Sequence, residues 1–261
     1  MTGNHRRVRL WLIALLASLL LSITVLTLAS PTTLAQFAGT AAVGYDPLTP
    51  AEQARALQSL QSKGAIAQNL VLPDVAAQSV TAAGAADGVP PGPAEVVLLV
   101  ERHQEDKQTY AQGRWPRRAD VYVYRYTDDT LVRQVYNMET NQVDQLDQVQ
   151  GVQLPLTEAE SQRALAIALA DATMRLQLDA EFRLITQQDL VSADQLILKA
   201  MTFHADAAPG QDLGAAAQCG AKRCAQLLLA AGDNVALRVI PIVDLSSGAV
   251  VQALPFGSAR Q

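Results

Sequence analysis

The sequence has few basic residues, few histidines and none of several common catalytic motifs. Its 20 lysines and arginines are outnumbered by 25 acidic residues, which gives a formal net charge of −5. Nucleic-acid binding requires clustered lysine and arginine, so we expect no nucleic-acid partner. No glycine-rich phosphate loop, Gly-x-Ser-x-Gly turn or His-Glu-x-x-His helix occurs. We therefore assign no catalytic residue, no cofactor and no metal ligand.

The first 35 residues have the layout of a secretory signal. Three arginines precede an uncharged apolar run over residues 10–29, and small residues lead to a cleavage point between Ala35 and Gln36. The run is also long enough to remain as a membrane anchor, so we expect a membrane contact only if it is not cleaved. Both alternatives place the rest of the chain outside the cytoplasm, as a periplasmic, secreted or membrane-anchored protein.

An eleven-residue phrase occurs twice, 108 residues apart. Residues 47–57 read PLTPAEQARAL and residues 155–165 read PLTEAESQRAL, with eight identical positions. In each copy a threonine is followed three residues later by a glutamate, the pattern of a capping box at a helix N-terminus. The phrase therefore predicts two helix starts and a structural role, with the capping residues Thr49, Glu52, Thr157 and Glu160.

Apolar residues after each capping box predict the buried face of a helix. The first helix has Ala54, Leu57 and Leu60 on this face and Gly64 at its end, and the second has Leu165, Ala168 and Leu169. The second helix continues or restarts through the segment DATMRLQLDAEF.

Strand patterns follow the helices in the same order in both copies. The expected strands are 94–101, 119–127 and 130–138 in the first copy, and 194–203, 224–231 and 235–245 in the second. The turn sequence NMETNQV matches DLSSGAV and places Asn141 opposite Gly248, two residue types that tolerate a left-handed backbone. Equivalent positions around these strands are assigned to Arg118 with Arg223, and to His103 with His204.

These patterns predict an α+β fold of two tandem units, each a helix packed on an antiparallel β-sheet, produced by internal duplication. The expected boundaries are a tether at 36–45, a first unit at 46–150 and a second unit at 151–256. Residues 81–93 are rich in alanine, glycine and proline, which indicates a flexible loop.

With both copies aligned, the chain resembles the N-terminal region of copper amine oxidases. The segments VQGVQLPLTEAE, RRADVYVYRY and LQLDAEFRLI carry the resemblance, which covers about residues 45–255. In that family two small cystatin-like domains precede a large catalytic domain, so the resemblance implies two cystatin-like units here.

The sequence departs from that family in its catalytic residues. The family makes a quinone from a tyrosine in an Asn-Tyr context and binds copper through three histidines. None of the six tyrosines here follows an asparagine, and only His103 and His204 follow the signal segment. No catalytic residue of the family can therefore be transferred.

Two cysteines, Cys219 and Cys224, enclose four residues. In an oxidising compartment this pair predicts a disulfide, which contributes about 2 kcal/mol by loop closure. A redox pair or a metal site is the alternative, although the spacing is not Cys-x-x-Cys and no further ligand is near.

Alternating tyrosines predict a candidate interface for a protein partner, with packing under a helix or against the other copy as the alternative. These residues are Tyr122, Tyr124 and Tyr126. His103 and His204 are interpreted as surface residues beside turns, with metal binding as the alternative, and Met201 as a core residue.

The favoured function is an exported, non-catalytic binding or scaffold module with a protein partner. One alternative is an accessory subunit or relative of a copper- and quinone-dependent amine oxidase, acting in amine metabolism with its catalytic chain elsewhere. A cystatin-type protease inhibitor is a further alternative. Its Gln-x-Val-x-Gly loop is matched only in part by QVQG at 148–151, which falls in the expected linker and follows an aspartate.

Overall fold

The computed structural model describes residues 46–67, 92–112, 115–210 and 212–255. The expected signal segment, the tether and residues 81–91 of the expected loop lie outside these ranges. The described residues from Pro47 onward belong to one compact unit, and their fold is α+β, as predicted. The boundary expected at residue 150 stays a prediction. Among the described helices, none has the length and apolar character that crossing a membrane requires.

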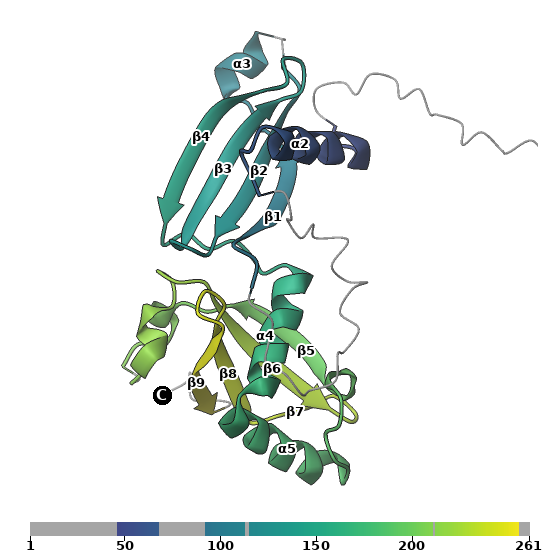
Figure 1. The fold of residues 1–261 in the computed structure, drawn as a ribbon, viewed down its shortest axis with the longest axis vertical. Helices are drawn as coiled ribbons and strands as arrows, with labels where there is room; N and C mark the ends of the chain where they lie inside the picture. The colour runs from purple at the N-terminus through teal and green to yellow at the C-terminus, as the bar shows by residue number, and fades with distance from the viewer. Residues whose placement is uncertain (1–45, 68–91, 113–114, 211, 256–261) are drawn as a thin grey trace, which may run out of the picture. The chain divides into compact units, whose positions relative to one another are not determined.

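The first half of the described chain is a helix on a four-stranded antiparallel meander. Helix α2 (Pro50–Ser62) crosses one face of the sheet (Figure 1). The sheet order is β1 (Glu95–Arg102), β2 (Arg118–Arg125), β3 (Thr130–Asn137) and β4 (Gln142–Gln150), with the short helix α3 (Lys107–Ala111) between β1 and β2. The helix buries Ala56, Leu57 and Leu60. The prediction that Ala54 is buried is wrong, because the row facing the sheet is centred closer to Ala56.

The second half repeats this order with a longer helical region. Two helices, α4 (Glu158–Ala170) and α5 (Ala172–Thr186), meet at Asp171, whose side chain caps α5 by accepting from the Met174 amide at 2.8 Å. The strand order is β5 (Ile197–Thr202), β6 (Cys224–Ala231), β8 (Val239–Asp244) and β9 (Ala249–Pro255), and the two-residue β7 (Val235–Ala236) pairs with β6. Short 3-10 turns at Ala193–Gln195, Ala205–Ala207 and Gly214–Gln218 complete this half.

Two expectations about strands need correction. Residues 148–150 of the expected linker belong to the edge strand β4, because the tight turn before β4 returns the chain to pair with β3. The expected strand 235–245 is divided into β7 and β8. Leu237 lies between them and donates its amide to the Leu229 carbonyl.

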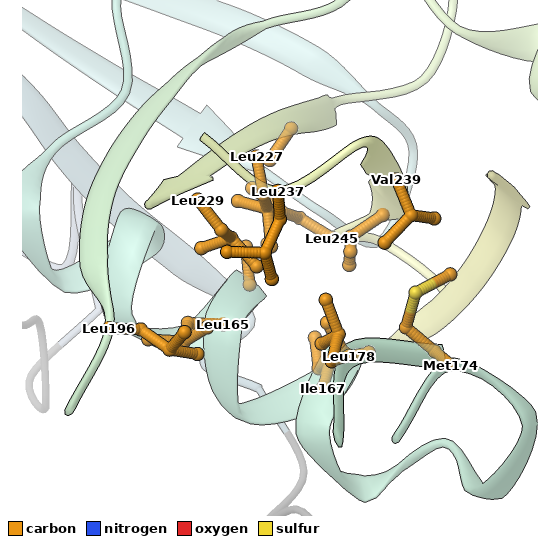
Figure 2. Close-up of a cluster of buried hydrophobic side chains, with 14 of the residues drawn as sticks. Leu165, Ile167, Met174, Leu178, Leu196, Leu227, Leu229, Leu237, Val239 and Leu245 are labelled. Atoms are coloured by element: carbon orange, nitrogen blue, oxygen red, sulfur yellow. The ribbon is translucent and has the colours of Figure 1, made fainter. Parts of the chain in front are cut away.

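The largest apolar core lies between α4, α5 and the second sheet. Figure 2 shows aliphatic side chains from both helices meeting those from the strands, including Leu165, Ile167, Leu178, Leu227 and Leu245. The same cluster includes residues of the first sheet, namely Val96, Leu98, Tyr124, Tyr126 and Leu131. One face of the first sheet therefore contributes to a core shared with the second half.

Candidate functional site

The two halves carry the same ion pair at the start of their first helix. In the first half, Arg117 donates to both oxygens of Glu52 at 2.9 and 2.8 Å and to the Pro47 carbonyl at 2.9 Å. We call this set of contacts the first clamp and its counterpart in the second half the second clamp. Glu52 also accepts from the Thr49 amide at 2.8 Å, while Thr49 accepts from the Glu52 amide. The capping box and the arginine thus share one carboxylate.

The second clamp has the same bonds at matching positions. Arg223 donates to both oxygens of Glu160 and to the Pro155 carbonyl at 3.1 Å. The Glu160 carboxylate accepts from the Thr157 amide at 2.8 Å, and Thr157 accepts from the Glu160 amide at 3.2 Å. Arg223 also donates to Leu154, which fixes the connection between the halves to the second sheet.

Burial distinguishes the clamps. The side chains of Arg223 and Glu160 are 0% and 3% exposed, whereas those of Arg117 and Glu52 are 11% and 19% exposed. The additional burial comes from the first sheet, because the Tyr126 hydroxyl donates to Glu160 at 2.6 Å. The Arg223 guanidinium also lies over the Tyr124 ring, 5.1 Å from its centre. The second clamp is therefore one place where polar groups of the two halves meet.

The clamps keep their groups charged. Hydrogen bonds from Arg117 are the largest cause that lowers the pKa of Glu52, to about 2. Burial raises the pKa of Glu160, but the bonds and charge of Arg223 outweigh it, so this pKa is also lowered. Burial, followed by the Glu160 charge, raises the pKa of Tyr126 and keeps its hydroxyl protonated as a donor. The two glutamates are therefore ionised and Tyr126 is protonated, which are the states that these hydrogen bonds require.

The three alternating tyrosines, Tyr122, Tyr124 and Tyr126, differ in how deeply they are buried. Tyr124 and Tyr126 are buried against the second half, so the prediction that they form an exposed partner surface is wrong, and the alternative of packing against the other copy describes them. The Tyr124 hydroxyl donates to Asp129 at 3.0 Å, and Asp129 also accepts from Ser246 of the second half. Tyr122 is half-buried beside the same cluster.

The hydrogen bonds correct two assigned equivalences. The carbonyl of Arg117 accepts from the Met138 amide, and that of Arg223 accepts from the Leu245 amide. Arg117, not Arg118, is therefore the counterpart of Arg223. By the same pattern, His103 corresponds to Phe203 and not to His204. Both expectations were one residue out. For the arginines, the reason is that two adjacent basic residues, Arg117–Arg118 and Lys222–Arg223, stand at the start of each strand. Asn141 and Gly248 both have positive φ, 55° and 70°, at matching turns.

The expected disulfide is present. Cys219 and Cys224 are bonded, with their Cα atoms 5.4 Å apart. The closed ring contains Arg223, and the ring carbonyl of Gly220 accepts from Gln153 of the connecting segment at 3.1 Å. Both cysteines are buried, and because the disulfide closes the ring, Arg223 contacts Glu160 from a constrained backbone.

A second charged cluster lies on the first sheet. His103 Nδ1 is 3.1 Å from an Asp120 oxygen, and Arg133 donates to the same carboxylate. Beside them, Arg118 contacts Glu105 at 3.4 Å. The prediction that His103 is a surface residue is wrong, since this network half-buries it. Met201 is 38% exposed, so its prediction as a core residue is also wrong. Within the described ranges, no three His, Cys, Asp or Glu residues are grouped to hold a metal ion.

Comparison with known proteins gives structural neighbours alone. No protein-family model and no curated protein matches the chain. A copper-containing benzylamine oxidase from Hansenula polymorpha has a TM-score of 0.47 at 13% identity, over 81% of this chain and 30% of that one. An Aspergillus nidulans amine oxidase has a TM-score of 0.36 at 15% identity, over 78% and 27%. This chain thus spans less than a third of either enzyme, and TM-scores below 0.5 assign it neither family nor function.

Proposed function

We propose that the chain is an exported, non-catalytic scaffold or binding module whose two helix-on-sheet units are held as one body by the second clamp. The observation that carries the proposal is the buried Glu160–Arg223 pair, which receives Tyr126 from the other half. A buried ion pair with complete hydrogen bonding restricts the geometry of the elements that it joins. A fixed arrangement is what a scaffold supplies to its partner.

The environment of the charged groups supports a structural role. Strongly shifted pKa values commonly accompany catalysis, yet they also arise from structural ion pairs. Here the shifted carboxylates Glu52 and Glu160 cap helices, and Asp106 and Asp128 accept hydrogen bonds in local turns. Each of these groups has a structural partner that accounts for the shift.

The equivalent clamps support duplication of one ancestral unit. The Pro, Thr, Glu and Arg contacts recur with the same atoms, although the sequences between them differ in length. We infer that the second clamp became the junction after duplication, when the first sheet covered it. The resemblance of the segments before and within α4 to amine oxidases makes an oxidase the first partner class to test.

Two assays separate the alternatives. Purified residues 36–261 should release no peroxide from primary amines with copper and oxygen present, above a copper-only control. Peroxide release that a tyrosine-to-phenylalanine change abolishes would show an enzyme instead. A papain-type protease should also retain full activity at a large excess of the chain, since inhibition would favour the cystatin-type alternative.

A further inference from the structure

The repeated phrase keeps an arginine that a capping box does not need. Arg55 and Arg163 occupy the same position in the two copies, three residues after the capping glutamate. Arg163 donates to the Leu245 carbonyl at 2.8 Å, and Arg55 contacts the Met138 sulfur at 3.4 Å. Leu245 and Met138 are themselves equivalent, since each donates its amide to the carbonyl of a clamp arginine. The arginine of the phrase therefore lies at the same place beside each clamp.

In the second half, two tyrosines of the first sheet cover this place. The Tyr126 hydroxyl donates to Glu160 at 2.6 Å, and the Arg163 guanidinium lies 5.6 Å from the centre of the Tyr126 ring. Tyr124, two residues earlier, contacts the Tyr126 ring edge-on and lies under Arg223. A strand end with tyrosines at positions i and i+2 therefore fits a glutamate that has an arginine on either side.

In the first half, the matching groups are accessible. Arg55 is exposed, whereas Arg163 is half-buried. In the part of the chain that the structure describes, Oε1 of Glu52 accepts a hydrogen bond from Arg117 alone, whereas Oε1 of Glu160 also accepts one from a tyrosine. The first clamp thus leaves open to solvent the carboxylate oxygen and the arginine that hold a tyrosine at the second clamp.

We propose that the first clamp is the docking surface for a different protein, one whose β-strand presents tyrosines at positions i and i+2. In this contact a hydroxyl donates to Glu52 and its ring covers Arg55, as Tyr126 does at the second clamp. Tyrosine and arginine are enriched in protein interfaces and carry much of their binding energy. The docking surface presupposes the binding role proposed above and adds the chemistry of the partner.

A second copy of this chain does not supply such a strand. Tyr124 and Tyr126 of the first sheet are already buried against the second half. The matching positions of the second sheet, counted from the equivalent clamp arginines, are Ala230 and Gly232. Neither residue offers a ring or a hydroxyl, so the occupant is a different protein.

A cyclic hairpin peptide of residues 120–135 supplies the tyrosine strand as a probe. Asp120 and Val135 are opposite each other in the register of β2 and β3, so a link between them closes the hairpin. Titration of the isotope-labelled mature chain with this peptide should shift the backbone NMR signals of Glu52 and Arg55, with half-saturation below about 1 mM. The absence of any shift up to this concentration overturns the proposal.

Matched variants test the contact itself. Arg55→Ala should weaken binding of the hairpin about 2- to 5-fold, because a cation–π contact is lost. Arg183→Ala, which removes an exposed arginine from α5, should leave binding unchanged. Tyr126→Phe in the peptide should weaken binding about 10-fold or more, because Glu52 loses a hydroxyl donor. Equal affinity of the original and Tyr126→Phe peptides would contradict the proposed contact.

The position of the shifts separates failure of the docking surface from failure of the scaffold. Shifts confined to Thr157 and Glu160 would show that the peptide displaces the first sheet from the second clamp, which contradicts both the docking surface and the fixed junction. With no shift anywhere, only the docking surface is overturned. Sedimentation of the mature chain should show a monomer, and a dimer that Arg55→Ala dissociates would overturn the assignment to a different protein.

Discussion

Replacing Glu160 by alanine should destabilise the protein far more than the same change at Glu52. Both changes remove the glutamate half of a capping box and leave its threonine cap in place. At Glu52 the lost ion pair with Arg117 is near the surface and adds about 0.2–1 kcal/mol. At Glu160 the change leaves Arg223 buried and without its carboxylate, which costs about 3–5 kcal/mol. The second loss is a large part of the 5–15 kcal/mol of a typical domain.

Urea unfolding followed by circular dichroism measures both losses. Glu160→Met combined with Arg223→Met provides the control, because removing both charges should cost less than leaving one buried. Glu160→Gln retains most of the shape and tests the charge alone. Equal destabilisation by Glu52→Ala and Glu160→Ala would refute the assignment of Glu160 as the buried tie between the halves.

Three further predictions concern the disulfide, pH and export. Replacing Cys219 and Cys224 by alanine should lower the free energy of unfolding by about 2 kcal/mol. It should also speed amide hydrogen exchange in residues 151–157, because Arg223 loses its constrained backbone. Unchanged exchange in these residues would show that the disulfide ring does not support the second clamp. Because the pKa of Glu52 is lowered from 4.5 to about 2, the stability that the ionised carboxylate contributes is present above pH 4.5 and is lost as the pH falls toward 2. Glu52→Gln should therefore make the free energy of unfolding depend less on pH in this range. The same pH dependence in Glu52→Gln and the unchanged protein would contradict this assignment. Sequencing of protein recovered from outside the cytoplasm should give Gln36 as the first residue, whereas Met1 would indicate a retained anchor.

The sequence was sufficient for features that depend on local spacing. The capping boxes follow from a threonine and a glutamate three residues apart, and the alternation of Tyr122, Tyr124 and Tyr126 predicts that they share a face. Neither pattern says which surface covers that face. The burial of Tyr124 and Tyr126 depends on contacts between halves distant in sequence.

The clamp arginines were missed although the sequence contains a signal for them. Each of the two strands has a basic pair at its start. Arg117–Arg118 spans the start of β2, and Lys222–Arg223 precedes β6. The choice of the inward-facing residue depends on where each strand begins to pair. Because β2 begins at Arg118 and β6 at Cys224, the residue before each strand turns toward the helix N-terminus. The strand β4 was missed because it is mostly polar, and its apolar residues Val143, Leu146 and Val149 do not alternate with period two.

The most direct test of the central claim is the distance between the two halves in solution. Spin labels at Gln58→Cys on α2 and Asp233→Cys in the turn after β6, both exposed, report it by pulsed electron paramagnetic resonance with the native disulfide intact. The account predicts one narrow distance distribution, retained in Glu52→Gln and broadened in Glu160→Gln. Two results would contradict a scaffold held together by Glu160 and Arg223. One is a broad distance distribution in the protein that retains Glu160, and the other is a distribution that stays narrow in Glu160→Gln.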